Sequence, residues 1–237
     1  MRYDFIEIGS CDFDTLLQKC RDDERGITIE PIRKYLDNLP NRENVKKVCA
    51  AVVPVVTDDI NVYFIDSDDF DHGSDQYWPG KKFPVYLRGC NSVSKPHDYH
   101  VACPETLWVA QQYGPDYATV MRTYNLLEAG HVKVEKCSCI TFEELVKENN
   151  VSFVNLIKLD TEGQDCVLLN SILDFYEKHT IQYPKIIQFE SNMHNEPDDV
   201  DRMCKRLADL GYRIDGWDGK NYPRHLHDCV AVLDQNS

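Results

Sequence analysis

The sequence predicts one α/β domain with a mostly parallel sheet that carries helices on both faces. Strand-length apolar runs alternate with helical patterns at both ends of the chain, which is typical of parallel strands joined by crossover helices. Polar or acidic residues follow directly after four of these runs, as expected where the strands of an open parallel sheet end. The 237 residues suit a single domain, and a hydrophobic share of 42% is sufficient for its core.

The N-terminal part is expected to form the order β-α-β-α-β. Apolar, β-rich residues predict strands over Tyr3–Ile8, Gly26–Glu30 and Val45–Val53. Helical spacing between them predicts helices over Phe13–Cys20 and Pro31–Leu39, the second with proline in its first turn. Strands joined in this way run parallel, because a right-handed crossover returns the chain to the same edge of the sheet.

The C-terminal part resumes the alternation. Thr141 opens a helix, because Thr-Phe-Glu-Glu places Glu144 at the third helical position, as a capping box requires. Gly211 ends the last helix. The expected elements are strands over His131–Ile140, Phe153–Leu159 and Lys185–Phe189, helices through Val167–Phe175 and over Val200–Leu210, and a terminal antiparallel pair of Tyr212–Ile214 with Cys229–Leu233.

Residues 66–130 interrupt the alternation. The stretch from Asp66 to Gly80 is acidic, aromatic and rich in turn residues, and so long a connection is expected to be ordered internally or to act as a functional lid. Asp116–Leu127 has apolar residues at helical spacing, which predicts a helix that packs in a core. We therefore expect a single domain over residues 1–237, with an insertion or lid at about residues 66–130.

Composition excludes several partners. The formal net charge of −14 repels phosphate backbones, so we expect no nucleic-acid substrate. No apolar run is long enough to span a bilayer, and the N-terminus lacks the features of a signal peptide. The sequence therefore predicts a soluble, cytoplasmic protein, and it carries no signal for an oligomeric state.

Ten cysteines are interpreted as reduced thiols rather than as a disulfide or zinc framework. Cys49, Cys166 and Cys229 lie in apolar runs and are expected to be small buried hydrophobic residues. Cys137 and Cys139 are expected to share one face of a single strand.

Two positions near the N-terminus suggest a nucleotide-like ligand. Gly9 directly follows a predicted strand, where glycine lets the backbone approach a ligand closely. Glu30 ends the next strand, where an acid commonly accepts hydrogen bonds from ribose hydroxyls. The alternative for Glu30 is an exposed acid placed favourably before a helix.

The segment IKLDTEGQDCVLL (residues 157–169) resembles the signature K-[IL]-D-x-E-G-x-[ED] of FkbM-type S-adenosylmethionine-dependent methyltransferases. FIEIGSCDFDTLL resembles the first adenosylmethionine motif of this family, GITIEP the second, and PKIIQFES the later strand that ends in Glu; RGCNSV is a fainter match to a loop of small residues between them. The family usually has D-x-G-A-N-x-G in the first motif, whereas this chain has Phe13 where a second glycine is common.

The resemblance implies a Rossmann-like class I methyltransferase fold, with a seven-stranded mixed sheet and an antiparallel C-terminal strand. It implies S-adenosylmethionine as cofactor and O-methylation as the activity, often of a sugar or natural-product hydroxyl. The residues expected to contact the cofactor are Glu7, Gly9, Ser10, Cys11, Glu30, Pro31 and Asp160.

Methyl transfer to a hydroxyl needs a group that takes up the hydroxyl proton. His194 is the first candidate for this base, with Asp160, Glu162 and Glu190 as the carboxylate candidates. These three acids are expected to form a cluster, because Asp160 and Glu190 end what should be neighbouring strands. Alternatively, Mg²⁺ held by Asp160, Glu190 and Asn192 would lower the pKa of the hydroxyl, because Mg²⁺ prefers oxygen ligands. His225 and His227 alternate within a loop and could line the substrate site, but the stronger expectation for them, as for His97 and His100, is that of solvated loop histidines.

Two other functions stay open. A nucleotide-dependent oxidoreductase would explain Gly9 and Glu30, but it requires G-x-G-x-x-G, which does not begin at Gly9. A methyltransferase-like module that binds a partner without activity would explain the altered first motif.

Overall fold

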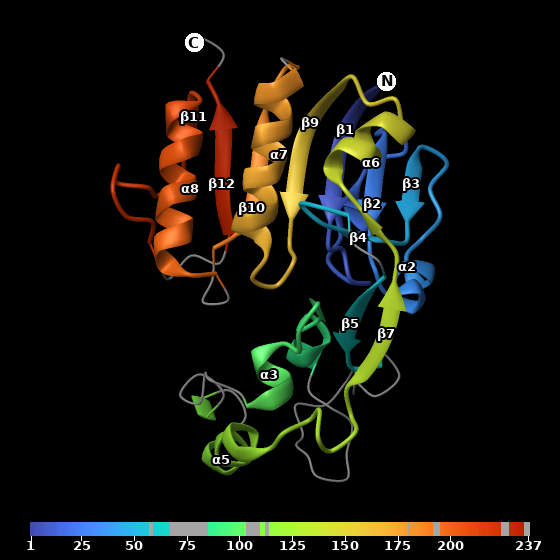
Figure 1. Cartoon of the computed structure of the whole chain (residues 1–237), viewed down its shortest axis with the longest axis vertical. Coiled ribbons are helices and arrows are strands. Elements are labelled where there is room, and N and C mark those ends of the chain that lie inside the picture. The colour runs from blue at the N-terminus through green and yellow to red at the C-terminus, as the bar shows by residue number, and fades with distance from the viewer. Residues whose placement is uncertain are drawn as a thin grey trace. The chain divides into compact units, whose positions relative to one another are not determined.

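A computed structural model describes residues 1–56, 59–66, 85–102, 110–111, 114–179, 181–191, 195–223 and 228–234 (Figure 1). The chain divides into two compact units, which are described separately below. The first unit comprises Met1–Asp58 and Ser138–Ser237, and the second comprises Asp59–Cys137. The single domain with an insertion at about residues 66–130 stays a prediction. Among the described residues, no helix combines the length and apolar character that crossing a bilayer requires.

The first unit contains a large mixed sheet, so the predicted α/β class with a mostly parallel sheet is confirmed. Its seven strands lie in the order β11-β12-β10-β9-β1-β2-β3. Neighbours from β10 to β3 pair in parallel, and β12 pairs antiparallel with both β10 and β11. The strands are β1 (Arg2–Ile8), β2 (Gly26–Ile29), β3 (Val45–Val48), β9 (Phe153–Leu159), β10 (Ile186–Glu190), β11 (Tyr212–Ile214) and β12 (Asp228–Leu233).

Helices pack against both faces of this sheet. They are α1 (Leu16–Lys19), α2 (Arg33–Asn38), α6 (Phe142–Glu148), α7 (Asp165–His179) and α8 (Pro197–Asp209), with α7 and α8 drawn in front of the sheet in Figure 1. The predicted capping box of Thr141 is confirmed, because its hydroxyl accepts the Glu144 N–H and Glu144 accepts the Thr141 N–H. Helices α1 and α2 are shorter than the sequence predicted.

Adjacent residues of β1 divide the core between the two faces, because strand side chains alternate. Ile6 belongs to the larger cluster, which includes buried residues of α6, α7 and α8. Phe5 belongs to a smaller cluster with Leu17 of α1 and Leu36 of α2. The helices on the two faces therefore bury separate apolar layers, and β1 lies between them.

Two of the predicted strands are each divided. Val45–Val53 contributes β3 to the large sheet, but Ala51–Val52 forms β4 and pairs in parallel with β8 (Cys139–Ile140). His131–Ile140 likewise divides into β7 (Lys133–Cys137), in the second unit, and β8, in the first. The prediction of continuous strands was wrong because each apolar run crosses from one set of pairing partners to another.

This division also corrects the cysteine predictions. Cys137 ends β7 and Cys139 begins β8, so the two do not share one face of a single strand. Cys166 and Cys229 are buried as predicted, whereas Cys49 is only partly buried. All nine cysteines in the described part of the chain are free thiols.

The second unit has its own antiparallel sheet, with strand order β6-β5-β7. It contains β5 (Ile60–Phe64), the 3-10 helix η2 (Val85–Arg88), β6 (Ser92–Val93), α3 (Asp98–Val101), α5 (Pro115–Thr123) and β7. The predicted helix over Asp116–Leu127 is present as α5, but it ends at Thr123. Met121 is buried in a cluster with Leu87, Tyr99 and Leu126, which confirms a packing role for this helix.

His97 and His100 lie inside the second unit, so the prediction of solvated loop histidines was wrong for both. Their exposed fractions are 5% and 0%. The His97 Nδ1 accepts the Tyr99 N–H at 3.1 Å at the start of α3. Burial lowers the pKa of His97 to about 4 and that of His100 to about 3, so both rings are neutral at pH 7.

We expect the second unit to lose stability in acid. Both pKa values lie below the ordinary histidine value of 6.5, so between about pH 6.5 and pH 4 the unfolded chain binds more protons than the folded chain. The free energy of unfolding therefore decreases as the pH is lowered, by about 1.4 kcal/mol per histidine per pH unit. Native-state hydrogen exchange of the Tyr99 and His100 amides at pH 7 and near pH 5 measures the change. Equal protection at both pH values would contradict it, and His100→Gln is expected to reduce the pH dependence.

Candidate active site

The polar residues expected to carry chemistry follow four strands of the first unit. These strands adjoin in the order β2-β1-β9-β10 and run parallel, so their carboxyl ends meet at one edge of the sheet. The segments at this edge are residues 9–15 after β1, Glu30 after β2, residues 160–164 after β9, and Glu190 at the end of β10.

Gly9 allows the chain after β1 to pass against the end of β9. Its φ is +81°, and a Cβ at this position would overlap the Asp160 carbonyl oxygen and come within 2.8 Å of the carbonyl carbon. The Asp160 N–H donates to the Ile8 carbonyl at 3.0 Å, and the Gly9 N–H donates to the Ile29 carbonyl at 3.0 Å. The missing side chain at Gly9 therefore lets three strand ends lie together.

Glu30 is buried between the loops that follow β1 and β2. One carboxylate oxygen accepts the Cys11 N–H at 2.7 Å, and the other accepts the Ile32 N–H at 2.9 Å. Burial raises the pKa of Glu30 to about 7, although both N–H donors act in the opposite direction. Because Glu30 is only 3% exposed, the alternative of an exposed acid before a helix was wrong.

Glu7 and Lys158 form a buried ion pair across β1 and β9. Glu7 is 0% exposed, and one of its oxygens accepts the Leu16 N–H at 2.8 Å and lies 3.3 Å from the Lys158 Nζ. The same ammonium lies 3.6 Å from Asp160. Burial raises the pKa of Glu7, while Lys158 acts to lower it. This pair connects the start of α1 with the residue that follows β9.

Asp165, at the start of α7, fixes the turn that follows β9. Its carboxylate oxygens both lie 3.3 Å from the Thr161 N, and one lies 3.2 Å from the Thr161 hydroxyl. Glu162, inside this turn, has a φ of +51°, which residues with a Cβ seldom adopt, and Gly163 has a φ of +93°. Asp165 therefore holds a turn in which the backbone of Glu162 is strained.

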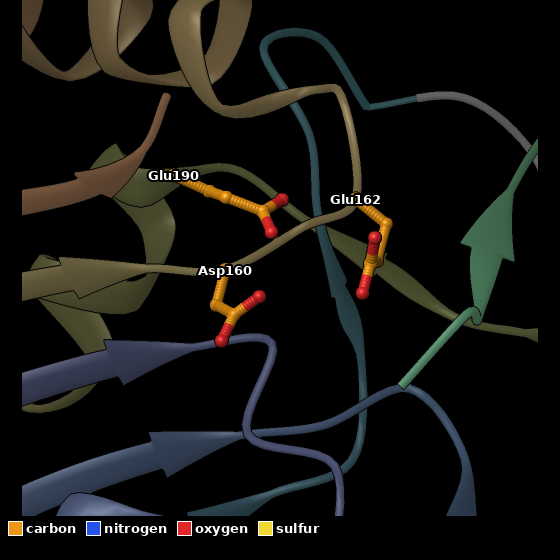
Figure 2. A group of neighbouring side chains, drawn as sticks. All are labelled: Asp160, Glu162 and Glu190. Carbon is orange, nitrogen blue, oxygen red and sulfur yellow. The ribbon is translucent and has the colours of Figure 1, made fainter. Parts of the chain in front are cut away.

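The turn brings three carboxylates together. Asp160, Glu162 and Glu190 each offer an oxygen within 4.8 Å of the others, and Figure 2 shows their side chains converging from the ends of β9 and β10. Within the described residues, this is the one group of His, Cys, Asp or Glu side chains with a geometry that suits a metal ion. The sequence predicted that Asp160, Glu162 and Glu190 would cluster, and the structure brings them together.

Charge crowding perturbs these acids. Burial and the neighbouring carboxylates raise the pKa values of Glu190 and Glu162 well above the ordinary range. Partial burial also raises the pKa of Asp160, but the Lys158 ammonium opposes that shift. Burial and Asp160 raise the pKa of Asp165 to about 7. The Lys158 ammonium therefore lies beside the Asp160 carboxylate of this cluster.

The remaining predicted residues have varied surroundings. Ser10 is buried and donates to the Cys11 carbonyl at 3.2 Å, while Cys11 and Pro31 are partly exposed. The predicted residues Asn192, His194, His225 and His227 lie outside the described residues.

Sequence reasoning missed Lys158 and Asp165. A charged residue within the apolar strand IKL is a signal for Lys158, and Asp165 occupies the acidic position of the quoted signature. Their partners, however, become visible only when the strand register and the turn are known.

Comparison with known proteins gave one match. Residues 7–214 match the family model described as Methyltransferase FkbM domain. The matched range includes all four strand ends of the candidate site. No curated protein and no solved structure matches the chain significantly.

We expect Gly9→Ala to destabilise the first unit more than a glycine replacement in open space. Gly219→Ala is the matched control, because Gly219 also has a positive φ of +92° but would place its Cβ with no atom within 4 Å. The control should cost about 1 kcal/mol for the backbone conformation alone. Gly9→Ala should cost about 1–3 kcal/mol more, because the Asp160 backbone must move. Equal losses in denaturant unfolding would contradict the proposed contact.

Proposed function

This chain belongs to the FkbM methyltransferase family, and on that basis we propose that it transfers a methyl group from S-adenosylmethionine to a hydroxyl oxygen of a small molecule. A sugar or glycan is the proposed acceptor class. The observation that carries this proposal is the convergence of Asp160, Glu162 and Glu190 beside the Gly9 turn (Figure 2). The strand order, with β12 antiparallel beside β10, also supports the class I methyltransferase arrangement.

The residues at the sheet edge fit the chemistry of this cofactor. Glu30 uses each oxygen for one backbone N–H, and a carboxylate oxygen has a second lone pair for a ribose hydroxyl. The sulfonium and ammonium groups of S-adenosylmethionine are positively charged, which suits a site rich in carboxylates. We therefore propose that Gly9, Ser10, Cys11, Glu30, Pro31 and Asp160 hold the cofactor. Glu7, which is fully buried, acts indirectly by holding the start of α1.

When bound, S-adenosylmethionine supplies an activated methyl group, so the protein mainly has to position the acceptor and manage one proton. Among the three clustered carboxylates, Asp160 has Lys158 beside it, which favours its ionised form. Burial and Asp160 raise the pKa of Glu162, and burial, Glu162 and Asp160 raise the pKa of Glu190, so their surroundings disfavour the ionised forms of both residues. His194 remains the proposed general base, with Asp160 as the carboxylate alternative.

A bound divalent cation is the alternative to a general base for removing the proton of the acceptor hydroxyl. Three carboxyl oxygens within 4.8 Å of one another repel when the groups are ionised, and a cation such as Mg²⁺ would relieve this repulsion and favour the ionised forms. Held by Asp160, Glu162 and Glu190, with Asn192 as a further proposed ligand, it would lower the pKa of the acceptor hydroxyl.

Calorimetry with S-adenosylhomocysteine, NAD and NADP tests the proposed function. We expect the wild-type protein to bind S-adenosylhomocysteine and neither dinucleotide. Glu30→Ala should weaken this binding by about 1–3 kcal/mol, because ribose hydroxyls and two backbone N–H groups lose their acceptor. Glu30→Gln, which keeps one carbonyl oxygen, should lose less. Binding of NAD alone would favour the oxidoreductase, and unchanged affinity in Glu30→Ala would remove Glu30 from the site.

Turnover measurements then distinguish a general base from a divalent cation as the group that promotes loss of the hydroxyl proton. On an acceptor found by transfer of a labelled methyl group, His194→Gln should lower turnover by about 10²–10⁴, the usual contribution of a positioned base, if His194 is the base, and Asp160→Asn should do so if Asp160 is the base. Asp209→Asn, an exposed acid on α8, is the matched control and should retain turnover. Full turnover in His194→Gln combined with complete loss in EDTA would support the cation. If neither treatment matters while Asp160→Asn is inactive with its affinity for S-adenosylhomocysteine intact, Asp160 is the base.

A further inference from the structure

We propose that Lys158 is a positioning residue that ties the loop after β1 to the acidic turn after β9. The inference rests on the proposed function, because both segments are proposed to meet the cofactor. In this proposal Lys158 does not itself contact the cofactor or the acceptor. It acts through Glu7 on one side and through Asp160 on the other.

On one side, Lys158 is linked through Glu7 to the start of α1. The Lys158 Nζ lies 3.3 Å from the Glu7 Oε1, and the same oxygen accepts the Leu16 N–H at 2.8 Å. The other Glu7 oxygen accepts the Thr28 hydroxyl at 3.5 Å. Because Glu7 has no exposed surface, its charge depends on Lys158 and on these donors. Residues 9–15 are therefore bounded by β1 at one end and by this anchored helix start at the other.

On the other side, Lys158 contacts Asp160, the first residue of the turn after β9. The Lys158 Nζ lies 3.6 Å from the Asp160 Oδ2, and the two residues are two positions apart on the same face at the end of β9. The Lys158 side chain is 15% exposed, compared with 41% for Asp160. The largely buried ammonium thus restrains one oxygen of a carboxylate that is itself partly exposed.

The two segments linked by Lys158 are also in direct backbone contact. Gly9 passes directly against the Asp160 carbonyl, and the Asp160 N–H donates to Ile8. The backbone contact fixes how closely the two segments approach, and Lys158 adds a side-chain link between their charged groups. Loss of Lys158 should therefore disturb residues 9–15 and 160–163 together rather than either segment alone.

The test compares Lys158→Met with Lys158→Arg, which keeps the charge and offers donors to both carboxylates. Lys158→Met should weaken S-adenosylhomocysteine binding about 10- to 100-fold, the usual cost of removing a group that orients a binding residue. Native-state hydrogen exchange should become faster in residues 9–15 and in residues 160–163. Lys158→Arg should restore both properties.

Lys46→Met is the matched control. Lys46, on β3 of the same sheet, donates to the Asn149 side chain at 2.6 Å, and it lies outside the proposed site. This variant should leave the affinity and the exchange of both segments unchanged, whatever its effect on the melting temperature.

A folding failure of Lys158→Met is addressed by the double variant Glu7→Gln/Lys158→Met. It removes both buried charges and keeps a side-chain oxygen for the Leu16 N–H, while Asp160 still loses its ammonium partner. Wild-type affinity and exchange in folded Lys158→Met, or in the folded double variant, would overturn the proposal. If the wild-type protein binds no S-adenosylhomocysteine, the proposed function fails, and coupled exchange of the two segments still decides whether Lys158 ties them.

Discussion

The parallel register of β1 with its two neighbours determines where the polar groups of the site lie. In this register Glu7 is paired with Thr28 on β2 and with Lys158 on β9. The next row is apolar, with Ile8 beside Ile29 and Leu159, and beyond it the three strands end together. Side chains far apart in the sequence therefore lie side by side, and a shift of one residue would reverse which face each occupies.

Placing so many acids at one edge has an energetic consequence. The folded state holds Glu30 and Asp165 with pKa values near 7, above their ordinary values of 4.5 and 3.8. Folding therefore favours the protonated acids, and their effect on stability becomes less favourable as pH rises from about 4 to 7. The buried histidines of the second unit have the opposite dependence. Groups with shifted pKa values concentrate at functional sites, where stability is partly given up for chemistry.

Much of the fold could be predicted from the sequence because the central strands are buried on both sides. Such strands are continuous apolar runs, and those beginning near Tyr3, Ile27 and Phe153 stand out from their polar flanks. The clustering of Asp160 with Glu190 could also be predicted, because both residues follow strands of one parallel sheet. The role of Glu7 could not, since position alone does not distinguish a ligand-facing acid from one beneath the loop. Lys158 was missed because its partner Glu7 is 151 positions away in the sequence.

The short pair of β4 and β8 stands where the chain leaves the first unit and where it returns. The Ala51 N–H donates to the Ser138 carbonyl at 2.9 Å, and the Val53 N–H donates to the Ile140 carbonyl at 3.0 Å. The two ends of the intervening segment are thus closed by a hydrogen-bonded stem within the first unit. The entropic cost of closing a longer or shorter segment changes only slowly with its length. The length of the segment between β4 and β8 can therefore change at little entropic cost while the register of the main sheet stays the same.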